Sequence, residues 1–236
     1  MPEPPYALRR SGRARRARLT LTAEGEALVV LPADADESVA GALVQRHHRW
    51  LERHRSRILA ERRALASRPA LDAGRLVQLG GVGHRIKIDR RATLARPSVV
   101  VHPDEPVLVV RLPGDKGHDL PAVLERWLRR EARRVLSQAV AARSTEMGLR
   151  ADRVSVRDQR TRWASASPTG TLSFSWRLVM CPPEVLDYVV VHELAHLRWR
   201  GHGPRFWSLV FRHVPDTDRH RRWLREQRGE LLRALD

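Results

Sequence analysis

Three histidines and one glutamate stand close together in the second half of the sequence. In the stretch YVVVHELAHLRWRGHGPRFW, residues 188–207, His192 and His196 are four residues apart, and His202 lies six residues further on. On a helix, residues four apart share one face, so both imidazoles can point at the same spot. A catalytic zinc ion is commonly held by three such neutral side chains, with one position left open. The spacing therefore predicts a Zn²⁺ site formed by His192, His196 and His202.

Glu193 follows the first histidine directly, and its place on the helix differs from that of the histidines. One residue further along a helix corresponds to a rotation of about 100°, which takes the carboxylate off the line that joins His192 and His196. From there it can reach a water molecule in the site instead of the metal, as a general base must. Two alternatives remain open: the third ligand is Glu226 or Glu230, or the histidines are a structural accident of a buried helix.

Several other segments accompany this motif. They are LRRSGRARRARLTL near the beginning, LVQLGGVGHRI in the middle, and then RTRWASAS, LSFSWRLVMCPPEVLDYVVVHELAHL and HGPRFWSLV. With them the sequence resembles the YgjP-like metallopeptidases, relatives of the SprT-type zincins, over nearly its whole length. The resemblance implies a zincin-like catalytic half with His192, His196 and His202 as metal ligands and Glu193 as the catalytic acid and base.

The chain departs from the usual pattern of that family in one strand and loop. Ala164 and Ala166 stand where the family usually has glycine and cysteine, and Ser175 stands where it usually has asparagine. In zincins this strand lies near the substrate cleft, so the resemblance implies Arg162, Trp163 and Ser175 as substrate-binding residues. The sequence leaves two roles open for Arg162, because a guanidinium can steer an acidic substrate or pair with a carboxylate of the protein.

The elements that must position these residues follow from hydrophobic periodicity and from the places of glycine and proline. The periodicity predicts a helix over 36–66 and another over 120–147, with Gly148 as its C-cap. It predicts strand pairs at 18–21 with 27–31, within 75–89, within 97–114, and at 153–157 with 172–176. The C-terminal helices are expected to begin near Pro183 and Pro204 and to break at Gly201 and Pro215.

These elements indicate an α+β protein. We expect a mixed strand and helix region over 1–118, followed by a zincin-like region over 119–236 in which a small antiparallel sheet lies over the HExxH helix. That helix is apolar almost all round, so it should be buried, and its histidines then need polar partners. A substrate peptide would extend along the sheet edge near 172–176 by strand addition. Cys181 is expected to be a small buried residue.

Composition indicates where the protein works and what it contacts. The formal charge of +17 favours contact with nucleic acid, and the arginine-rich stretch 9–18 is either a basic strand edge or a polyanion contact. The N-terminus has no apolar run of the signal-peptide kind, and no stretch approaches the roughly 18 apolar residues of a membrane span. With a single cysteine, which cannot form an intramolecular disulfide, we expect a soluble cytoplasmic protein that does not enter membranes.

Three functions are compatible with a metal site in this setting. A zinc metallopeptidase would hydrolyse a protein or peptide with a metal-activated water and Glu193 as general base. A metal-dependent hydrolase of nucleotide phosphoanhydrides would need basic residues converging on the cleft. A nucleic-acid-associated module with a structural zinc would need a fourth protein ligand. Because no second cysteine or fourth histidine lies near the motif, the sequence favours the peptidase.

Overall fold

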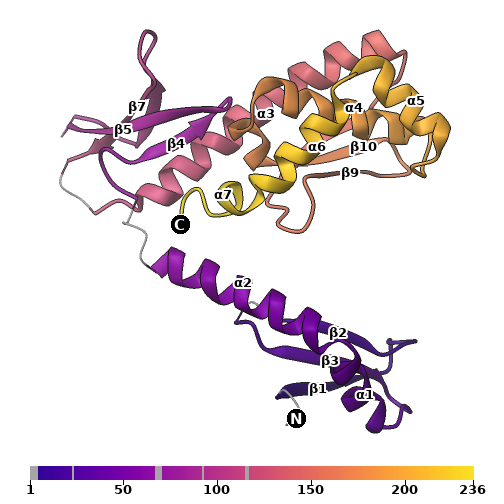
Figure 1. The fold of residues 1–236 in the computed structure, drawn as a ribbon. Helices are drawn as coiled ribbons and strands as arrows, with labels where there is room; N and C mark the ends of the chain where they lie inside the picture. The colour runs from indigo at the N-terminus through magenta and orange to yellow at the C-terminus, as the bar shows by residue number, and fades with distance from the viewer. Residues whose placement is uncertain (1–4, 23, 67–70, 92, 115–116) are drawn as a thin grey trace. The chain divides into compact units, whose positions relative to one another are not determined.

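The computed structural model describes residues 5–22, 24–66, 71–91, 93–114 and 117–236. The chain forms two compact units, residues 1–69 and residues 70–236 (Figure 1). Each unit has a hydrophobic core of its own. None of the helices in the described part of the chain is long and apolar enough to cross a membrane.

The N-terminal unit combines a three-stranded sheet with two helices. The strands are β1 (Tyr6–Ser11), β2 (Arg18–Leu21) and β3 (Ala27–Pro32), and the helices are α1 (Ser38–Arg46) and α2 (His48–Ala66). The central strand β3 is antiparallel to β2, which confirms the predicted hairpin, and parallel to β1. The helix predicted over 36–66 is divided at His47, where the backbone leaves the helical conformation.

The second unit begins with a four-stranded sheet in the order β4-β5-β7-β6. Its strands are β4 (Leu76–Leu79), β5 (Val82–Arg91), β6 (Ser98–Val101) and β7 (Val107–Pro113). Both predicted strand pairs, β4 with β5 and β6 with β7, are antiparallel hairpins. The parallel pairing of β5 with β7 joins them into one sheet.

The turn between β4 and β5 braces the chain just before the histidine helix. Gly80 and Gly81 donate backbone hydrogen bonds of 2.9 Å each to the carbonyl oxygens of Val179 and Met180. Gly81 has a φ of 80°, and a Cβ atom at this position would lie 2.8 Å from the ring of Pro182. Glycine is therefore required here for both backbone conformation and space.

A long helix and a second small sheet follow. They are α3 (Leu120–Met147), β8 (Arg153–Arg157), β9 (Ala164–Ala166) and β10 (Thr171–Ser175). The predicted helix is confirmed, and Gly148 ends it in the left-handed conformation with a φ of 61°.

The small sheet differs from the antiparallel sheet that we expected. Its order is β8-β10-β9, and β10 is parallel to β8 and antiparallel to β9. After β8 the chain crosses to the far side and returns through β9, a strand of three residues that the sequence pattern did not indicate. The edge strand is therefore β9, whereas β10, the predicted peptide-binding edge, is paired on both sides.

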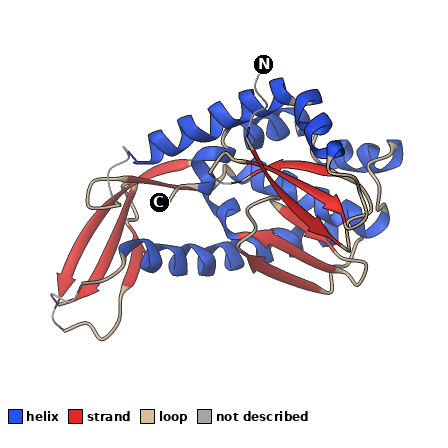
Figure 2. Cartoon of the chain, turned by 90° about the horizontal axis from the view of Figure 1, so that it is seen from below, coloured by secondary structure: helices blue, strands red, loops and turns tan. Residues whose placement is uncertain are grey.

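The rest of the chain is helical. It forms a 3₁₀ helix, η1 (Trp176–Met180), and then α4 (Pro183–Arg198), α5 (Pro204–His213), α6 (Thr217–Glu226) and α7 (Arg228–Leu232). As expected from its own apolar residues, α4 is largely buried, with α3, α5, α6 and β9 packed around it. Figure 2 shows the helices and strands of the chain by type. The helix starts predicted at Pro183 and Pro204 are confirmed.

One core runs through the whole second unit. Ile86 and Leu108 of the four-stranded sheet belong to the same buried cluster as Leu128 of α3 and Val190 of α4. The predicted boundary between residues 118 and 119 falls inside this unit, because the apolar face of α3 packs against elements on both sides of that boundary.

A charged network ties α3 to α4 and α5. Arg143 donates from Nε to Asp187 Oδ1 at 2.8 Å, from Nη2 to the other oxygen of Asp187, and from Nη1 to Glu146. The second oxygen of Glu146 lies 2.8 Å from Nδ1 of His213. The hydrogen bonds from His213 and Arg143 hold the pKa of Glu146 below its usual value.

We expect the substitution Arg143→Gln to lower the free energy of unfolding by about 1–3 kcal/mol, because it leaves the partly buried carboxylate of Asp187 without its partner. Urea denaturation followed by circular dichroism measures this. The matched control is Arg134→Gln, since the partners of Arg134 lie on α3 itself and Arg134 is more exposed than Arg143, and its effect should be clearly smaller. Equal effects of the two substitutions would show that the network does not hold the helices together.

Candidate metal centre

The structure brings the three histidines of the motif to one point. Their ligand nitrogen atoms all lie within 4.8 Å of one another, and Nε2 of His202 is 3.2 Å from Nε2 of His192. Two nitrogen atoms bound to one tetrahedral zinc ion at about 2.0–2.1 Å are about 3.3 Å apart. The observed separation therefore suits two ligands of a single metal ion, and the nitrogen donor set suits zinc.

The chain returns over the end of α4 through a short turn. The helix ends at Arg198, three residues before the predicted stop at Gly201, and Trp199 already has an extended backbone. His202 follows, and α5 begins two residues later at Pro204. Gly201 does not have a positive φ, so the turn does not depend on the special backbone freedom of glycine.

Two further groups hold the histidine rings in orientations that suit metal binding. Nδ1 of His196 lies 3.1 Å from the carbonyl oxygen of Trp199, to which it can donate its hydrogen. Nδ1 of His192 lies 3.4 Å from the hydroxyl of Tyr188, one helical turn earlier. In both rings Nε2 is then left for the metal, and such outer partners commonly set the tautomer of a metal-binding histidine. Sequence analysis missed Tyr188, although its position four residues before His192 places it on the same helix face.

Burial keeps the helical histidines neutral, as metal ligands must be. Burial lowers the pKa of His192 to about 3, and the neighbouring His196 and His202 act in the same direction. Burial also lowers the pKa of His196. Burial raises the pKa of Tyr188 to about 12, so its hydroxyl stays protonated near neutral pH.

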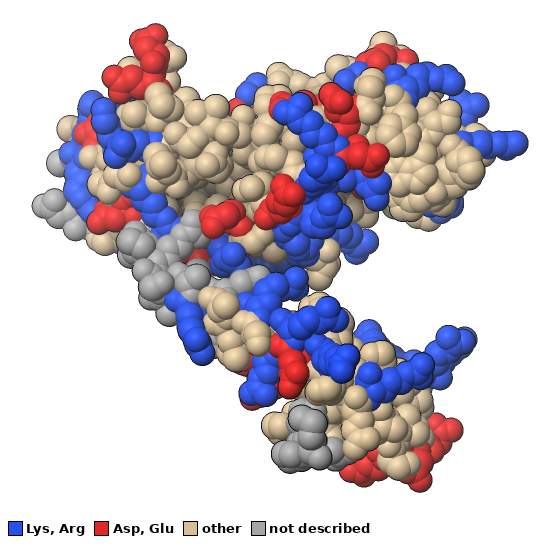
Figure 3. All heavy atoms as spheres, in the orientation of Figure 1, with Lys and Arg blue, Asp and Glu red and all other residues tan. Residues whose placement is uncertain are grey.

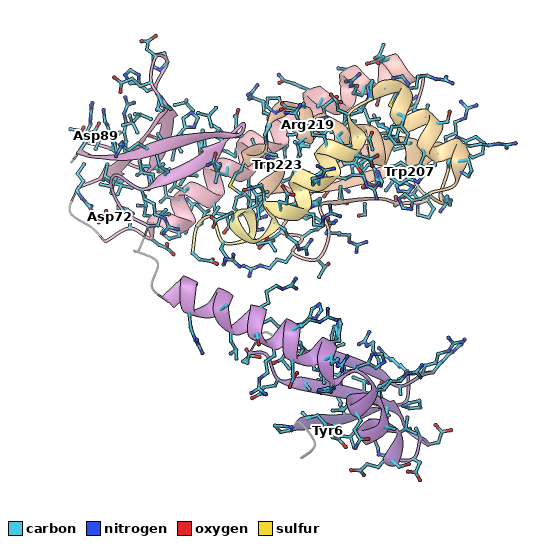
Figure 4. The ribbon with its side chains drawn as sticks, in the orientation of Figure 1. Tyr6, Asp72, Asp89, Trp207, Arg219 and Trp223 are labelled. Atoms are coloured by element: carbon cyan, nitrogen blue, oxygen red, sulfur yellow. The ribbon has the colours of Figure 1, made fainter. Side chains whose placement is uncertain are left out.

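Aromatic side chains form the wall behind the histidines. Phe206 is fully buried, and its ring centre lies 4.6 Å from that of His196 and 5.0 Å from that of His192. Trp207, labelled on α5 in Figure 4, lies 5.6 Å from His202 between ring centres. These contacts restrict rotation of the imidazoles, so the group is arranged in advance for a ligand.

Glu193 is buried beside the histidines and faces the short strand β9. Burial raises the pKa of Glu193 to about 7, while the charge of Arg162 and a hydrogen bond from the backbone of Ala166 oppose this rise. Its Oε2 atom is buried and has no hydrogen-bond partner among the described residues. A carboxyl group with a pKa near neutrality can both accept and return a proton under physiological conditions.

The three predicted substrate-binding residues lie in different environments. Arg162 is exposed, and its charge acts on Glu193. Trp163 is half-buried, with the guanidinium of Arg228 located 5.9 Å from its ring centre. Ser175 is fully buried, and its backbone N–H donates to the carbonyl oxygen of Trp163 at 2.7 Å. Ser175 therefore supports Trp163 from the interior and does not line an open surface.

The remaining candidates lie outside the cluster. Among the described residues, neither Glu226 nor Glu230 belongs to the group that can hold a metal ion. His220 is buried, with its ring centre 6.1 Å from that of Tyr188. Cys181 is buried as expected, and burial raises the pKa of its thiol, which keeps it unreactive.

Comparison with known proteins identifies the class of the enzyme. The family model described as YgjP-like, metallopeptidase domain, matches residues 15–227. The chain therefore belongs to the YgjP-like metallopeptidase family, which implies a metal ion. Among solved structures, the metallopeptidase zymogen abylysin of Pyrococcus abyssi is similar with a TM-score of 0.36 and 21% identity, over 39% of this chain and 93% of that chain. No curated protein matches the chain.

We expect Tyr188→Phe to weaken zinc binding by about tenfold or more, because removal of the hydroxyl leaves Nδ1 of His192 without its partner. Competition with a chromophoric chelator measures the zinc dissociation constant. The control is Tyr6→Phe in the N-terminal sheet, which should not change it. An unchanged zinc affinity in Tyr188→Phe, with the metal-free protein still folded, would show that Tyr188 does not position His192.

Proposed function

We propose that this protein is a zinc-dependent metallopeptidase with a zincin-like arrangement of α4 beneath the sheet β8-β10-β9. Its ligands are His192, His196 and His202, and its general base is Glu193. The observation that carries the proposal is the convergence of three imidazoles, within 4.8 Å, beside a buried carboxylate. Membership of a metallopeptidase family supports it.

Zinc held by these imidazoles supplies a Lewis acid that makes water more acidic and polarises the scissile carbonyl. Glu193 accepts the proton of the attacking water and later passes it to the leaving amine, for which its raised pKa is suitable. The backbone of Ala166 stabilises the charged form of this carboxyl group. The aromatic wall of Phe206 and Trp207 keeps the ligand rings aligned.

The substrate in this proposal is an extended peptide that pairs with β9. One side of β9 pairs with β10, and β9 is the edge of the sheet. Strand addition to such an edge uses only main-chain groups, so it accepts many sequences. It places the scissile bond beside Glu193, since β9 also packs on α4. Arg162, just before β9, is exposed to a substrate bound in this way.

A structural zinc is the main competing interpretation, and it requires a different number of protein ligands. Such a zinc has four protein ligands, whereas the described residues offer a group of three. An open fourth position is what a hydrolytic site needs.

Purified protein should contain about one zinc ion per chain, and His202→Ala should lose most of it because three-point binding is broken. Elemental analysis by mass spectrometry measures the metal content. Glu226→Ala and Glu230→Ala are the matched comparisons and should retain zinc. If His202→Ala keeps its full zinc content and one of the glutamate variants loses zinc, the third ligand is that glutamate and not His202.

Glu193→Gln should retain zinc and the fold but hydrolyse peptides 10²-fold to 10⁴-fold more slowly, because an amide cannot act as a general base. The rate of cleavage of a casein or peptide library, measured with zinc content on the same preparation, tests this. Glu184→Gln, at an exposed position in the first turn of α4, is the control and should keep full activity. If Glu193→Gln cleaves at the wild-type rate, the mechanism is wrong and the site is structural.

A further inference from the structure

The sheet of the N-terminal unit has two faces of different character. Tyr6 and Leu8 of β1 and Leu19 of β2 pack against the cluster that β3 forms with α1 and α2. Side chains alternate between the faces of a sheet, so the residues between them point the other way. Arg9 of β1 and Arg18 of β2 are in register with the same residue, Val30 of β3, from its two sides. These three therefore form one row on the face away from the helices.

Both arginines of this row are exposed, whereas Val30 between them is only 4% exposed, although it is not part of the helix-side cluster. The aliphatic stems of long basic side chains commonly cover such a residue while their charged ends stay in water. The row thus presents two guanidinium groups, one from β1 and one from β2. These two strands lie on either side of β3, so their backbones are about 9–10 Å apart.

The connection between β1 and β2 extends this charge. It contributes Arg13, Arg15 and Arg16, all exposed. We refer to Arg9, Arg13, Arg15, Arg16 and Arg18 together as the basic face. Figure 3 shows Lys and Arg side chains projecting from the right-hand end of this unit, with a group of Asp and Glu side chains below them.

Nothing within the described part of the unit neutralises the basic face. Residues 5–22 contain six arginines and no aspartate or glutamate. Arg10, the sixth, points to the helix side and donates to the carbonyl oxygens of Ala33 and Ala35. None of the five arginines of the basic face forms an ion pair with a described carboxylate. Like charges gathered in this way repel one another, and an external polyanion relieves that repulsion.

We propose that the basic face binds the phosphate backbone of double-stranded nucleic acid, without reading its sequence. Guanidinium groups match phosphate oxygens in geometry and charge, and a duplex presents one charge per about 1.7 Å of its axis. Tyr6 points to the helix side, so the row offers no ring on which single-stranded bases could stack. The row also lacks exposed large apolar side chains of the kind that enter a lipid surface. This binding is independent of the metal centre and of the proposed peptidase activity.

The test uses the full chain and a labelled 20-base-pair duplex of mixed sequence, with fluorescence anisotropy between 50 and 200 mM salt. Each phosphate contact contributes about 0.9 to the slope of log affinity against log salt, so the triple substitution Arg13→Gln, Arg15→Gln and Arg16→Gln should reduce that slope by about 2 to 3. The matched control, Arg126→Gln, Arg130→Gln and Arg133→Gln, removes the same charge from exposed positions on α3 and should leave the slope unchanged. Circular dichroism confirms that both variants are folded.

Three outcomes would overturn the proposal. The first is no binding of the duplex by wild type at 50 mM salt, and the second is an equal loss of affinity in the two triple variants, which would mean that only net charge matters. The third is tighter binding to phosphatidylserine vesicles or to poly-glutamate than to the duplex, because the partner would then be a membrane or an acidic protein. A single-stranded DNA of the same length should bind more weakly than the duplex.

Discussion

The metal centre depends on the burial of α4, a helix that carries polar groups on an otherwise apolar surface. Burial keeps the imidazoles of His192 and His196 neutral and raises the pKa of Glu193 to about 7. The same three side chains in water would have ordinary pKa values and freely rotating rings. Removing water thus keeps the imidazoles in the neutral form that binds metals and brings the pKa of the carboxyl group close to neutrality.

Burial of α4 requires the surrounding elements to be fixed in place. The β4–β5 turn is hydrogen-bonded to the residues just before the helix, and Gly81 lies directly against Pro182. On another side, the network of Arg143, Asp187 and Glu146 joins α3 to α4. The four-stranded sheet therefore belongs to the same unit as the histidine cluster for a physical reason. It shares a hydrophobic core with α3, and its β4–β5 turn is hydrogen-bonded to the residues just before α4.

The two units use opposite electrostatic arrangements. In the second unit, the buried guanidinium group of Arg177 is paired with Asp158. In the N-terminal unit, the charge of the basic face is exposed and unpaired among the described carboxylates. An exposed charge costs little free energy in water, and it remains available to a partner. The family model spans 15–227, so it covers part of each unit.

Much of the local structure, and the residue types of the site, could be predicted from the sequence. A period of 3.6 residues indicated α3 and α4, prolines indicated the starts of α4 and α5, and the HExxH spacing indicated that His192 and His196 share a face. These features are local, because each depends on residues less than two helical turns apart. The basic character of 9–18 could also be read directly.

Other features depend on contacts between distant segments, and only the tertiary structure decided them. The sequence pattern could not show that β10 runs parallel to β8, because the three residues of β9 have too little alternation to indicate a strand. It could not place Ser175 in the core or the N–H of Ala166 against Glu193, since both positions depend on how the small sheet packs on α4. Nor could it show that Arg9 and Arg18 lie in one row, because β1 and β2 meet only through their pairing with β3. Local spacing determines which side chains an element presents, whereas strand register and packing determine which of them meet.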